Sequence, residues 1–270
     1  MRTAIITGAS SGIGQRFAEV LGNADGIDEI WLIARRVDRL ADMQNSIKAR
    51  VVPISLDLTY SKCLREYRHM LADRAPEVCV LVNAAGKGCI GDFEELELSE
   101  QLDMIDLNVS ALTSVTYDTL PYMSAGGQIY QIASASAFAP LPGLSTYAAT
   151  KAYVRSFSES LNTELKRRKI RVIAVCPGWV RTEFLEAASG WPDTLGKIRL
   201  FLTAKQVVRK AMRDMRLGRT VSVCGARYRA ARLLAKLLPA RAVAFVWRRS
   251  NPGKRKKSRK KKTYREDKTS

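Results

Sequence analysis

The chain has 270 residues, of which 46% are hydrophobic, and a formal net charge of +19. This composition supplies a buried core and argues against global disorder, and the length suits one large α/β domain or two small ones. The charge is concentrated at one end: residues 227–270 hold 17 Lys and Arg against two acids, whereas residues 1–226 hold 28 against 24. The single histidine, His69, argues against a His-based triad or a multi-histidine metal site, so no metal is predicted.

The sequence also predicts a compartment. The N-terminus has no signal-peptide pattern, and no run approaches the roughly 20 apolar residues of a spanning helix. The five cysteines are scattered without paired CxxC spacing, which favours free thiols in a reducing compartment. We therefore expect a cytoplasmic protein.

Short β-branched runs alternate with amphipathic stretches along residues 1–226. Strands are predicted at residues 3–7, 30–34, 51–55, 78–83, 128–133, 171–176 and 221–223. Helices are predicted near 12–20, 37–48, 60–73, 99–118, 147–168 and 203–217. Strands that are apolar on both faces and separated by helices predict a doubly wound parallel sheet, a Rossmann-like α/β fold in a single domain.

The first predicted strand leads into Thr-Gly-Ala-Ser-Ser-Gly-Ile-Gly at residues 7–14. Gly8, Gly12 and Gly14 let the backbone turn tightly and approach a pyrophosphate, which the N-terminus of the next helix would face. The spacing is GxxxGxG rather than the general GxGxxG. The strand–loop–helix context favours phosphate binding over a plain turn.

The end of the second strand indicates which nucleotide is bound. An NAD site usually has an acidic residue there for the ribose 2′-hydroxyl, but this chain has Ala34 followed by Arg35 and Arg36. Guanidinium groups can hold a 2′-phosphate through paired hydrogen bonds. We therefore predict NADP(H), with Arg35 the stronger candidate, although both arginines could simply begin a solvated helix.

Tyr147 and Lys151 lie four residues apart in a predicted helix, so they share one face. A nearby ammonium favours the phenolate, and we expect Lys151 to lower the tyrosine pKa from about 10. Tyr147 would then exchange protons near neutrality. The spacing alone is common on solvated helices and gains meaning from the other motifs.

Together these motifs resemble the short-chain dehydrogenase/reductase family over residues 3–225. Residues 7–14 are similar to its TGxxxGIG loop, and residues 83–86 to its NNAG segment, with Ala84 at the second position. Ser134 lies thirteen residues before Tyr147, which is the family spacing. Further matches are the adenine-contacting pair Asp57 and Leu58, the catalytic Asn108, and the nicotinamide-packing segment with Pro177, Gly178 and Thr182.

The resemblance implies a role for each catalytic residue. Tyr147 would protonate the ketone oxygen or deprotonate the alcohol, Lys151 would lower its pKa and hold the nicotinamide ribose, and Ser134 would stabilise the substrate oxygen. Asn108 would position a water that links Lys151 to solvent. Structural alternatives remain: Ser136 rivals Ser134, Asn108 could be a buried helix-kink residue, Asn83 a sheet-centre residue and Asp57 a helix cap.

The resemblance also implies partners and a cofactor site. Homodimers or homotetramers are expected through the helices near 99–118 and 147–168. The implied cofactor-binding residues are Gly8, Ser10, Ser11, Gly12, Ile13, Gly14, Arg35, Arg36, Asp57, Leu58, Asn83, Ala84, Gly86, Tyr147, Lys151, Pro177, Gly178, Val180 and Thr182.

The substrate-binding lid is expected at residues 182–202. Its apolar residues suggest a lipophilic carbonyl such as a steroid, fatty-acyl or aromatic ketone, although they could equally be core contacts of a helical insertion. These residues are Phe184, Leu185, Trp191, Leu195, Ile198, Leu200 and Phe201. The chain resembles the 17-beta-hydroxysteroid-dehydrogenase-like branch more than the 3-oxoacyl-carrier-protein reductases.

Residues 227–250 form a basic amphipathic segment that Pro239 divides into two predicted helices, and residues 251–270 are predicted to be a disordered polybasic tail. The amphipathic segment suits a membrane surface, a partner protein, or its own domain. We favour peripheral contact with anionic membrane, because apolar residues lead directly into the basic run. A near-neutral body without a nucleic-acid module disfavours nucleic acid as the partner.

The leading functional prediction is therefore an oxidoreductase that transfers a hydride between NADP(H) and a ketone or secondary alcohol. The alternative is a non-catalytic cofactor-binding regulator or a membrane-associated interaction protein on the same fold. Such proteins typically lose the tyrosine or the lysine, and both are present here.

Overall fold

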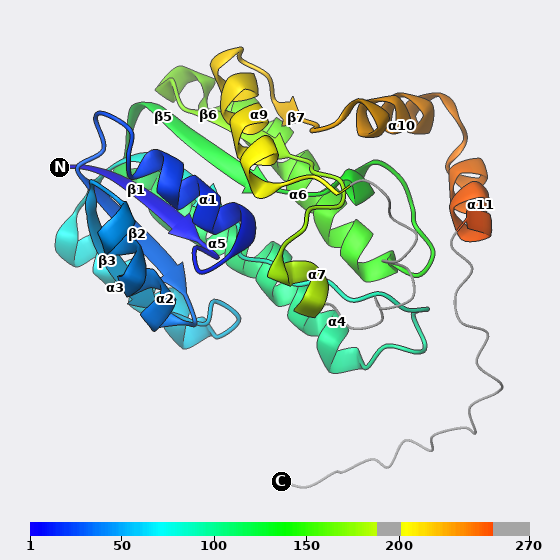
Figure 1. Cartoon of the computed structure of the whole chain (residues 1–270), viewed down its shortest axis with the longest axis horizontal. Helices are drawn as coiled ribbons and strands as arrows, with labels where there is room; N and C mark the ends of the chain where they lie inside the picture. Colours follow the sequence, from blue (N-terminus) through cyan, green and yellow to red (C-terminus); the bar gives the residue numbers. More distant parts are fainter. Residues whose placement is uncertain (188–200, 251–270) are drawn as a thin grey trace, which may run out of the picture.

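A computed structural model describes residues 1–187 and 201–250 (Figure 1). Its centre is a parallel sheet in the order β3-β2-β1-β4-β5-β6-β7. The strands are β1 (Arg2–Thr7), β2 (Glu29–Ala34), β3 (Arg50–Ser55), β4 (Glu77–Asn83), β5 (Met123–Ile132), β6 (Arg171–Val175) and β7 (Val221–Ser222). The strand order reverses between β1 and β4, which is where such sheets bind ligands. The predicted Rossmann-like single domain is confirmed.

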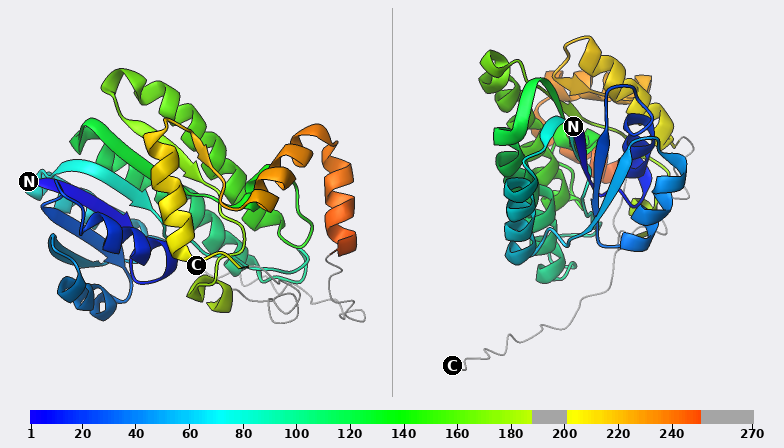
Figure 2. Two further views of the ribbon diagram at one scale, coloured as in Figure 1. Left: turned by 45° about the horizontal axis from the view of Figure 1, so that its top comes forward. Right: turned by 90° about the vertical axis from the view of Figure 1, so that its left-hand side faces the viewer.

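Helices cover both faces of the sheet, which is why the central strands are apolar throughout (Figures 1 and 2). The helices α1 (Gly12–Leu21), α2 (Val37–Asp42) and α9 (Ala204–Arg216) share one hydrophobic core with the strands. The helices α3 (Ser61–Arg74), α5 (Leu112–Thr119) and α6 (Ser145–Glu164) share the other core.

Several predicted elements differ from the observed ones; the helix expected near 37–48, for example, is α-helical only to Asp42. Two further differences lie between β4 and β5. The helix expected near 99–118 consists of α4 (Leu98–Ile105), a π-helical turn (Asp106–Ala111) and α5. Such turns are rare and frequently mark functional sites. Strand β5 begins at Met123, five residues early, because its pairing with β4 shifts register between Met123 and Gln128 around the positive-φ Gly126. Neither feature has a signal in the hydrophobic pattern.

Beyond β7 the chain forms α10 (Ala226–Leu237) and α11 (Ala240–Ser250), at the end of the molecule away from the N-terminus (Figures 1 and 2). Pro239 separates them, as predicted. Among the described residues, no helix combines the length and apolarity needed to cross a membrane. The predicted tail at 251–270, and Trp191, Leu195, Ile198 and Leu200 of the expected lid, lie outside the described residues.

Candidate active site

The loop between β1 and α1 is closely packed around its glycines. A Cβ on Gly14 would lie 2.2 Å from the carbonyl oxygen of Gly8, and a Cβ on Gly8 would lie 2.6 Å from the amide nitrogen of Ala85. Gly8 and Gly12 also have positive φ values of 66° and 60°. The loop thus brings Ser10, Ser11 and Ile13 to the sheet edge at the β1/β4 reversal. A side chain at Gly8 or Gly14 would collide with the neighbouring backbone and force this tight turn apart.

The two arginines after β2 have different surroundings. Arg35 is 79% exposed, with its guanidinium 3.9 Å from the carboxylate of Asp57. Arg36 donates to the hydroxyl of Ser10 at 3.3 Å and to the carboxylate of Glu183 at 2.8 Å. Arg39, one turn further along α2, bonds the other oxygen of Glu183. The geometry therefore favours Arg36 over Arg35 as the anion-binding arginine and adds Arg39.

Several implied cofactor residues serve the scaffold. Asp57 accepts hydrogen bonds from the backbone and hydroxyl of Thr59, just before α3, and the Leu58 side chain is buried in the core. Buried Asn83 donates to Thr116 and to Gln131, both at 3.0 Å, while its Oδ1 atom has no hydrogen-bond partner. The contacts of Asn83 match the sheet-centre alternative, although its Oδ1 atom lacks a partner. Asp57 does not cap α3, whose N-cap is Tyr60; it stabilises the turn that precedes the helix.

Ser134, Tyr147 and Lys151 converge at the carboxyl end of β5. The Ser134 side chain caps a 3₁₀ turn (Ala135–Phe138), and its hydroxyl lies beside the Tyr147 phenol, where it acts to lower the phenol pKa. The Nζ atom of Lys151 donates to the carbonyl oxygen of Ile132 at 2.9 Å and lies 5.8 Å from the centre of the Tyr147 ring. Ser136 is buried, and its hydroxyl has no hydrogen-bond partner. Ser134, rather than Ser136, is therefore the serine in contact with Tyr147.

Burial governs the ionisation of this group. It raises the pKa of Tyr147 to about 12, against the lowering effect of the Ser134 hydrogen bond. Burial also lowers the pKa of Lys151 to about 8, because the ammonium loses its hydration. We predicted that Lys151 lowers the pKa of Tyr147. In the protein without cofactor this prediction is wrong, because the pKa is raised. Desolvation of the phenol is the largest effect on its pKa, so the phenol is neutral at physiological pH.

Asn108 lies in the π-helical turn and is fully buried. Its Oδ1 accepts from the backbone N–H of Lys87 at 2.9 Å, and its Nδ2 donates to the Lys87 carbonyl and to the Thr150 hydroxyl. A Cβ on Gly86 would lie 3.1 Å from this Oδ1 and 3.4 Å from Nζ of Lys151. Asn108 therefore tethers the loop after β4 to α6, and Gly86 lets that loop pass beside Lys151.

The segment after β6 faces the glycine loop. Val180 is buried, and the methyl group of Thr182 would lie 3.0 Å from a Cβ on Gly12. The carbonyl of Pro177 accepts from the backbone of Ala135, next to Ser134. The implied nicotinamide-packing segment thus lies between the glycine loop and the Ser134 turn. Its Gly178 instead packs against a residue that the sequence did not point to, Tyr228 of α10.

Apolar side chains gather beside Tyr147. The ring of Phe184, from α7 (Glu183–Ala187), lies 6.0 Å from the Tyr147 ring, and the Phe184 ring leaves no room for a side chain at Gly88. One apolar cluster contains Leu185 together with Ile90, Trp179, Phe184 and Phe201. Three of the residues named for substrate binding therefore meet on this side of the phenol.

Sequence reasoning missed Arg39, Glu183 and Tyr228. Arg39 follows Arg36 by three residues on a helix, so the spacing was a usable signal. Glu183 and Tyr228 come into place only through contacts of residues far apart in the chain. Within the described ranges, no group of three or more His, Cys, Asp or Glu side chains is placed to hold a metal ion.

The family model for short chain dehydrogenases matches residues 2–193. An uncharacterized oxidoreductase of Staphylococcus epidermidis is 30% identical over 187 residues, which make up 68% of this chain and 80% of that protein. The chain therefore belongs to the short-chain dehydrogenase family. It is an oxidoreductase of a family that binds a nicotinamide cofactor.

Solved structures agree with this assignment. A short-chain dehydrogenase from Sphingobium yanoikuyae in complex with NADPH is 28% identical, with a TM-score of 0.75, covering 97% of this chain and 100% of that one. A bulky-bulky ketone specific alcohol dehydrogenase from Comamonas testosteroni is 25% identical, with a TM-score of 0.71, covering 96% and 97% of the two chains.

Proposed function

We propose that the protein is an NADP(H)-dependent carbonyl reductase, or alcohol dehydrogenase in reverse, acting on a lipophilic ketone or secondary alcohol. The observation that carries the proposal is the convergence of the Ser134 hydroxyl, the Tyr147 phenol and buried Lys151 at the carboxyl end of β5. This arrangement supplies a proton donor and an oxyanion partner without a metal ion.

The residues present fit a nicotinamide dinucleotide. The close approach of Gly8 and Gly14 leaves bare backbone at the N-terminus of α1, as pyrophosphate binding requires. The buried Oδ1 of Asn83 has no protein partner and is available to accept a hydrogen bond at the site. A bound nicotinamide cofactor supplies or accepts the hydride.

The protein's own residues then handle the proton. In reduction, Tyr147 donates its phenolic proton to the ketone oxygen as the carbonyl carbon gains the hydride, which yields the alcohol. The Ser134 hydroxyl donates a hydrogen bond to the same oxygen and stabilises its developing negative charge. Lys151 is placed to stabilise the phenolate left behind, and Asn108 holds the loop beside Lys151 in position. The high pKa of Tyr147 favours the protonated form that reduction needs.

The cofactor preference rests on Ser10, Arg36 and Arg39. The guanidinium groups of Arg36 and Arg39 already hold the carboxylate of Glu183, and Arg36 also donates to the Ser10 hydroxyl, in a geometry that also suits the oxygens of a 2′-phosphate. The NADPH bound to the Sphingobium yanoikuyae relative supports the same preference. The lipophilic substrate is supported by the apolar cluster beside Tyr147 and by the ketone-specific relative from Comamonas testosteroni.

Substitution of Tyr147 tests the reaction. We expect Tyr147→Phe to lower kcat/KM for ketone reduction about 10²–10⁴-fold, because the proton donor is lost. NADPH binding, followed by fluorescence titration, should remain close to that of the unmodified protein. Tyr117→Phe, at an exposed position on α5, is the control. The substrates are a panel of aliphatic, aromatic and steroid ketones, and unimpaired reduction by Tyr147→Phe would contradict the mechanism.

We further propose a cytoplasmic homo-oligomer that touches anionic membrane through α10 and α11. Membrane contact is supported by six large apolar residues of α10, α11 and their connection, which are 45–72% exposed. It is also supported by the absence of acidic residues from 226–250. These exposed residues are Leu233, Leu234, Leu237, Leu238, Phe245 and Val246.

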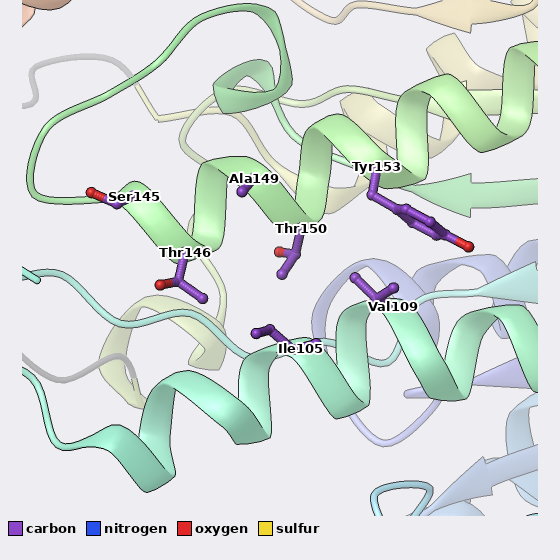
Figure 3. A pocket seen from close by; sticks show the side chains of 7 residues that line it. All are labelled: Ile105, Val109, Ser145, Thr146, Ala149, Thr150 and Tyr153. Carbon is purple, nitrogen blue, oxygen red and sulfur yellow. The ribbon is translucent and has the colours of Figure 1, made fainter.

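A homodimer is supported by an open groove of about 430 Å³ between α4 and α6 (Figure 3).

A further inference from the structure

The helices α10 and α11 begin at the core and return to the rim of the candidate active site. Tyr228 of α10 lies directly against Gly178, where a Cβ would come within 1.9 Å of the Tyr228 ring. The Tyr228 hydroxyl accepts from the backbone N–H of Trp179 at 3.1 Å, and its ring packs with the core cluster that contains Ala133 and Cys176. The base of this segment is therefore part of the domain core and not a detachable tail.

Its far end is fastened to two loops. Arg248 of α11 makes two parallel hydrogen bonds to the carboxylate of Asp92, at 2.6 and 2.7 Å. The indole N–H of Trp247 donates to the carbonyl oxygen of Pro142 at 3.1 Å. Asp92 belongs to the connection from β4 to α4, and Pro142 to the connection from β5 to α6. Adjacent residues of one helix thus hold two loops that are far apart in sequence.

The same two loops flank the Tyr147 phenol. In the first, a Cβ on Gly88 would lie 3.3 Å from the Tyr147 ring, and Ile90 belongs to the apolar cluster with Phe184. The second loop leads directly into α6, which carries Tyr147. The loops also bond each other, because the N–H of Gly91 donates to the carbonyl oxygen of Gly143 at 3.0 Å. A change in their separation would alter the space beside the phenol.

We propose that Trp247 and Arg248 are positioning residues that fix the spacing of the 87–97 and 139–144 loops and thereby determine which carbonyl substrates bind productively. An isolated exposed ion pair contributes little, but the Arg248–Asp92 pair is bidentate and acts beside the Trp247 hydrogen bond. Ordering both loops before binding lowers the entropic cost of seating a substrate large enough to touch them. A small ketone that reaches only Ser134 and Tyr147 gains nothing from this.

The inference rests on the proposed function, so its test has one readout that needs no turnover. Hydrogen exchange of the full-length, cofactor-free chain should be faster in peptides from both loops in Arg248→Gln and in Asp92→Asn. Arg249→Gln removes the same charge one residue away from an exposed position and should leave exchange unchanged. The exchanged pair, Asp92→Arg with Arg248→Asp, should restore protection, which separates the contact from general damage to the fold.

The second readout is substrate selection. For Arg248→Gln and Asp92→Asn we expect KM for a steroid ketone to rise about fivefold or more, with kcat and KM for cyclohexanone unchanged. Unaltered loop exchange in both variants would overturn the proposed fastening. Faster exchange with an unaltered ratio of the two KM values would overturn the role in specificity. If the unmodified protein reduced neither ketone, the proposed function and this specificity role would fall together, while exchange would still report on the contact.

Discussion

Lys151 is 4% exposed and donates to a backbone carbonyl, while the Tyr147 phenol beside it lies next to Ser134. Burial moves both groups toward their neutral forms, because an enclosed site solvates neither ammonium nor phenolate well. The phenol thus begins the proposed reduction protonated. The effect of burial on the two pKa values was not evident from the spacing of Tyr147 and Lys151, which indicated only that they share a helix face.

The depressed pKa of Lys151 predicts a pH dependence of stability. The unfolded lysine keeps its proton until about pH 10.4, whereas the folded one loses it near pH 8. Between these values the unfolded state binds more protons, so the free energy of unfolding should rise with pH. Urea unfolding at pH 8 and pH 10 should show a rise about 2 kcal/mol larger in the unmodified protein than in Lys151→Met. Equal pH dependence in both proteins would contradict a buried lysine with this pKa.

The carboxylate of Glu183 occupies the donors that we assign to the 2′-phosphate. Arg36→Gln should raise KM for NADPH about tenfold to a hundredfold and leave KM for NADH unchanged, because it removes charge-assisted hydrogen bonds. Glu183→Gln should tighten NADPH binding, since the competing anion is gone. Titration with 2′,5′-ADP measures the effect without turnover. Weaker NADPH binding by Glu183→Gln would contradict this prediction. It would show that the Glu183 carboxylate assists binding of the 2′-phosphate instead of competing with it.

At the scale of elements, the π-helical turn sets the relation of α4 to α6. It places Asn108 between the loop after β4 and Thr150 of α6. The neighbouring groove is lined by Ile105, Val109, Ser145, Thr146, Ala149, Thr150 and Tyr153 (Figure 3). Ile105 and Tyr153 are each 39% exposed there. An apolar, half-exposed surface of this kind suits a second copy of the chain.

The groove predicts the effect of a single charge on assembly. Ile105→Glu should shift the protein from dimer toward monomer in sedimentation velocity experiments, because the carboxylate would be buried without a partner. Leu217→Glu, at an exposed position after α9, serves as the control and should leave the mass unchanged. A dimer that persists in Ile105→Glu would place the interface on another surface.

At the scale of the whole molecule, the C-terminal helices are docked on the Rossmann-like domain. Tyr228 packs into its core, so a truncation at residue 226 would remove a core side chain as well as the amphipathic surface. The sequence indicated a membrane-surface helix, a partner-binding helix or a docked helix. The structure shows docking through Tyr228, Trp247 and Arg248, and it leaves apolar residues such as Leu237 and Phe245 exposed.

Membrane contact is therefore best tested in the full-length chain. We expect flotation with vesicles that contain phosphatidylserine and little with phosphatidylcholine alone, since the segment is basic and has exposed apolar side chains. Leu237→Glu combined with Phe245→Glu should reduce flotation strongly, and higher salt should weaken it. Leu217→Glu again serves as the control. Equal flotation of the double variant and the unmodified protein would show that Leu237 and Phe245 are not part of the membrane-binding surface.

The sequence by itself determined the alternation of strands and helices, the glycine loop and the Tyr147–Lys151 face, because each depends on residues close together in the chain. Hydrophobic periodicity and glycine chemistry are local properties that a single sequence displays. Only the tertiary structure decided that Arg36 rather than Arg35 bonds the carboxylate of Glu183, that burial raises the pKa of Tyr147, and that Tyr228 fills the space at Gly178. Desolvation and contacts between distant residues exist only once the chain has packed.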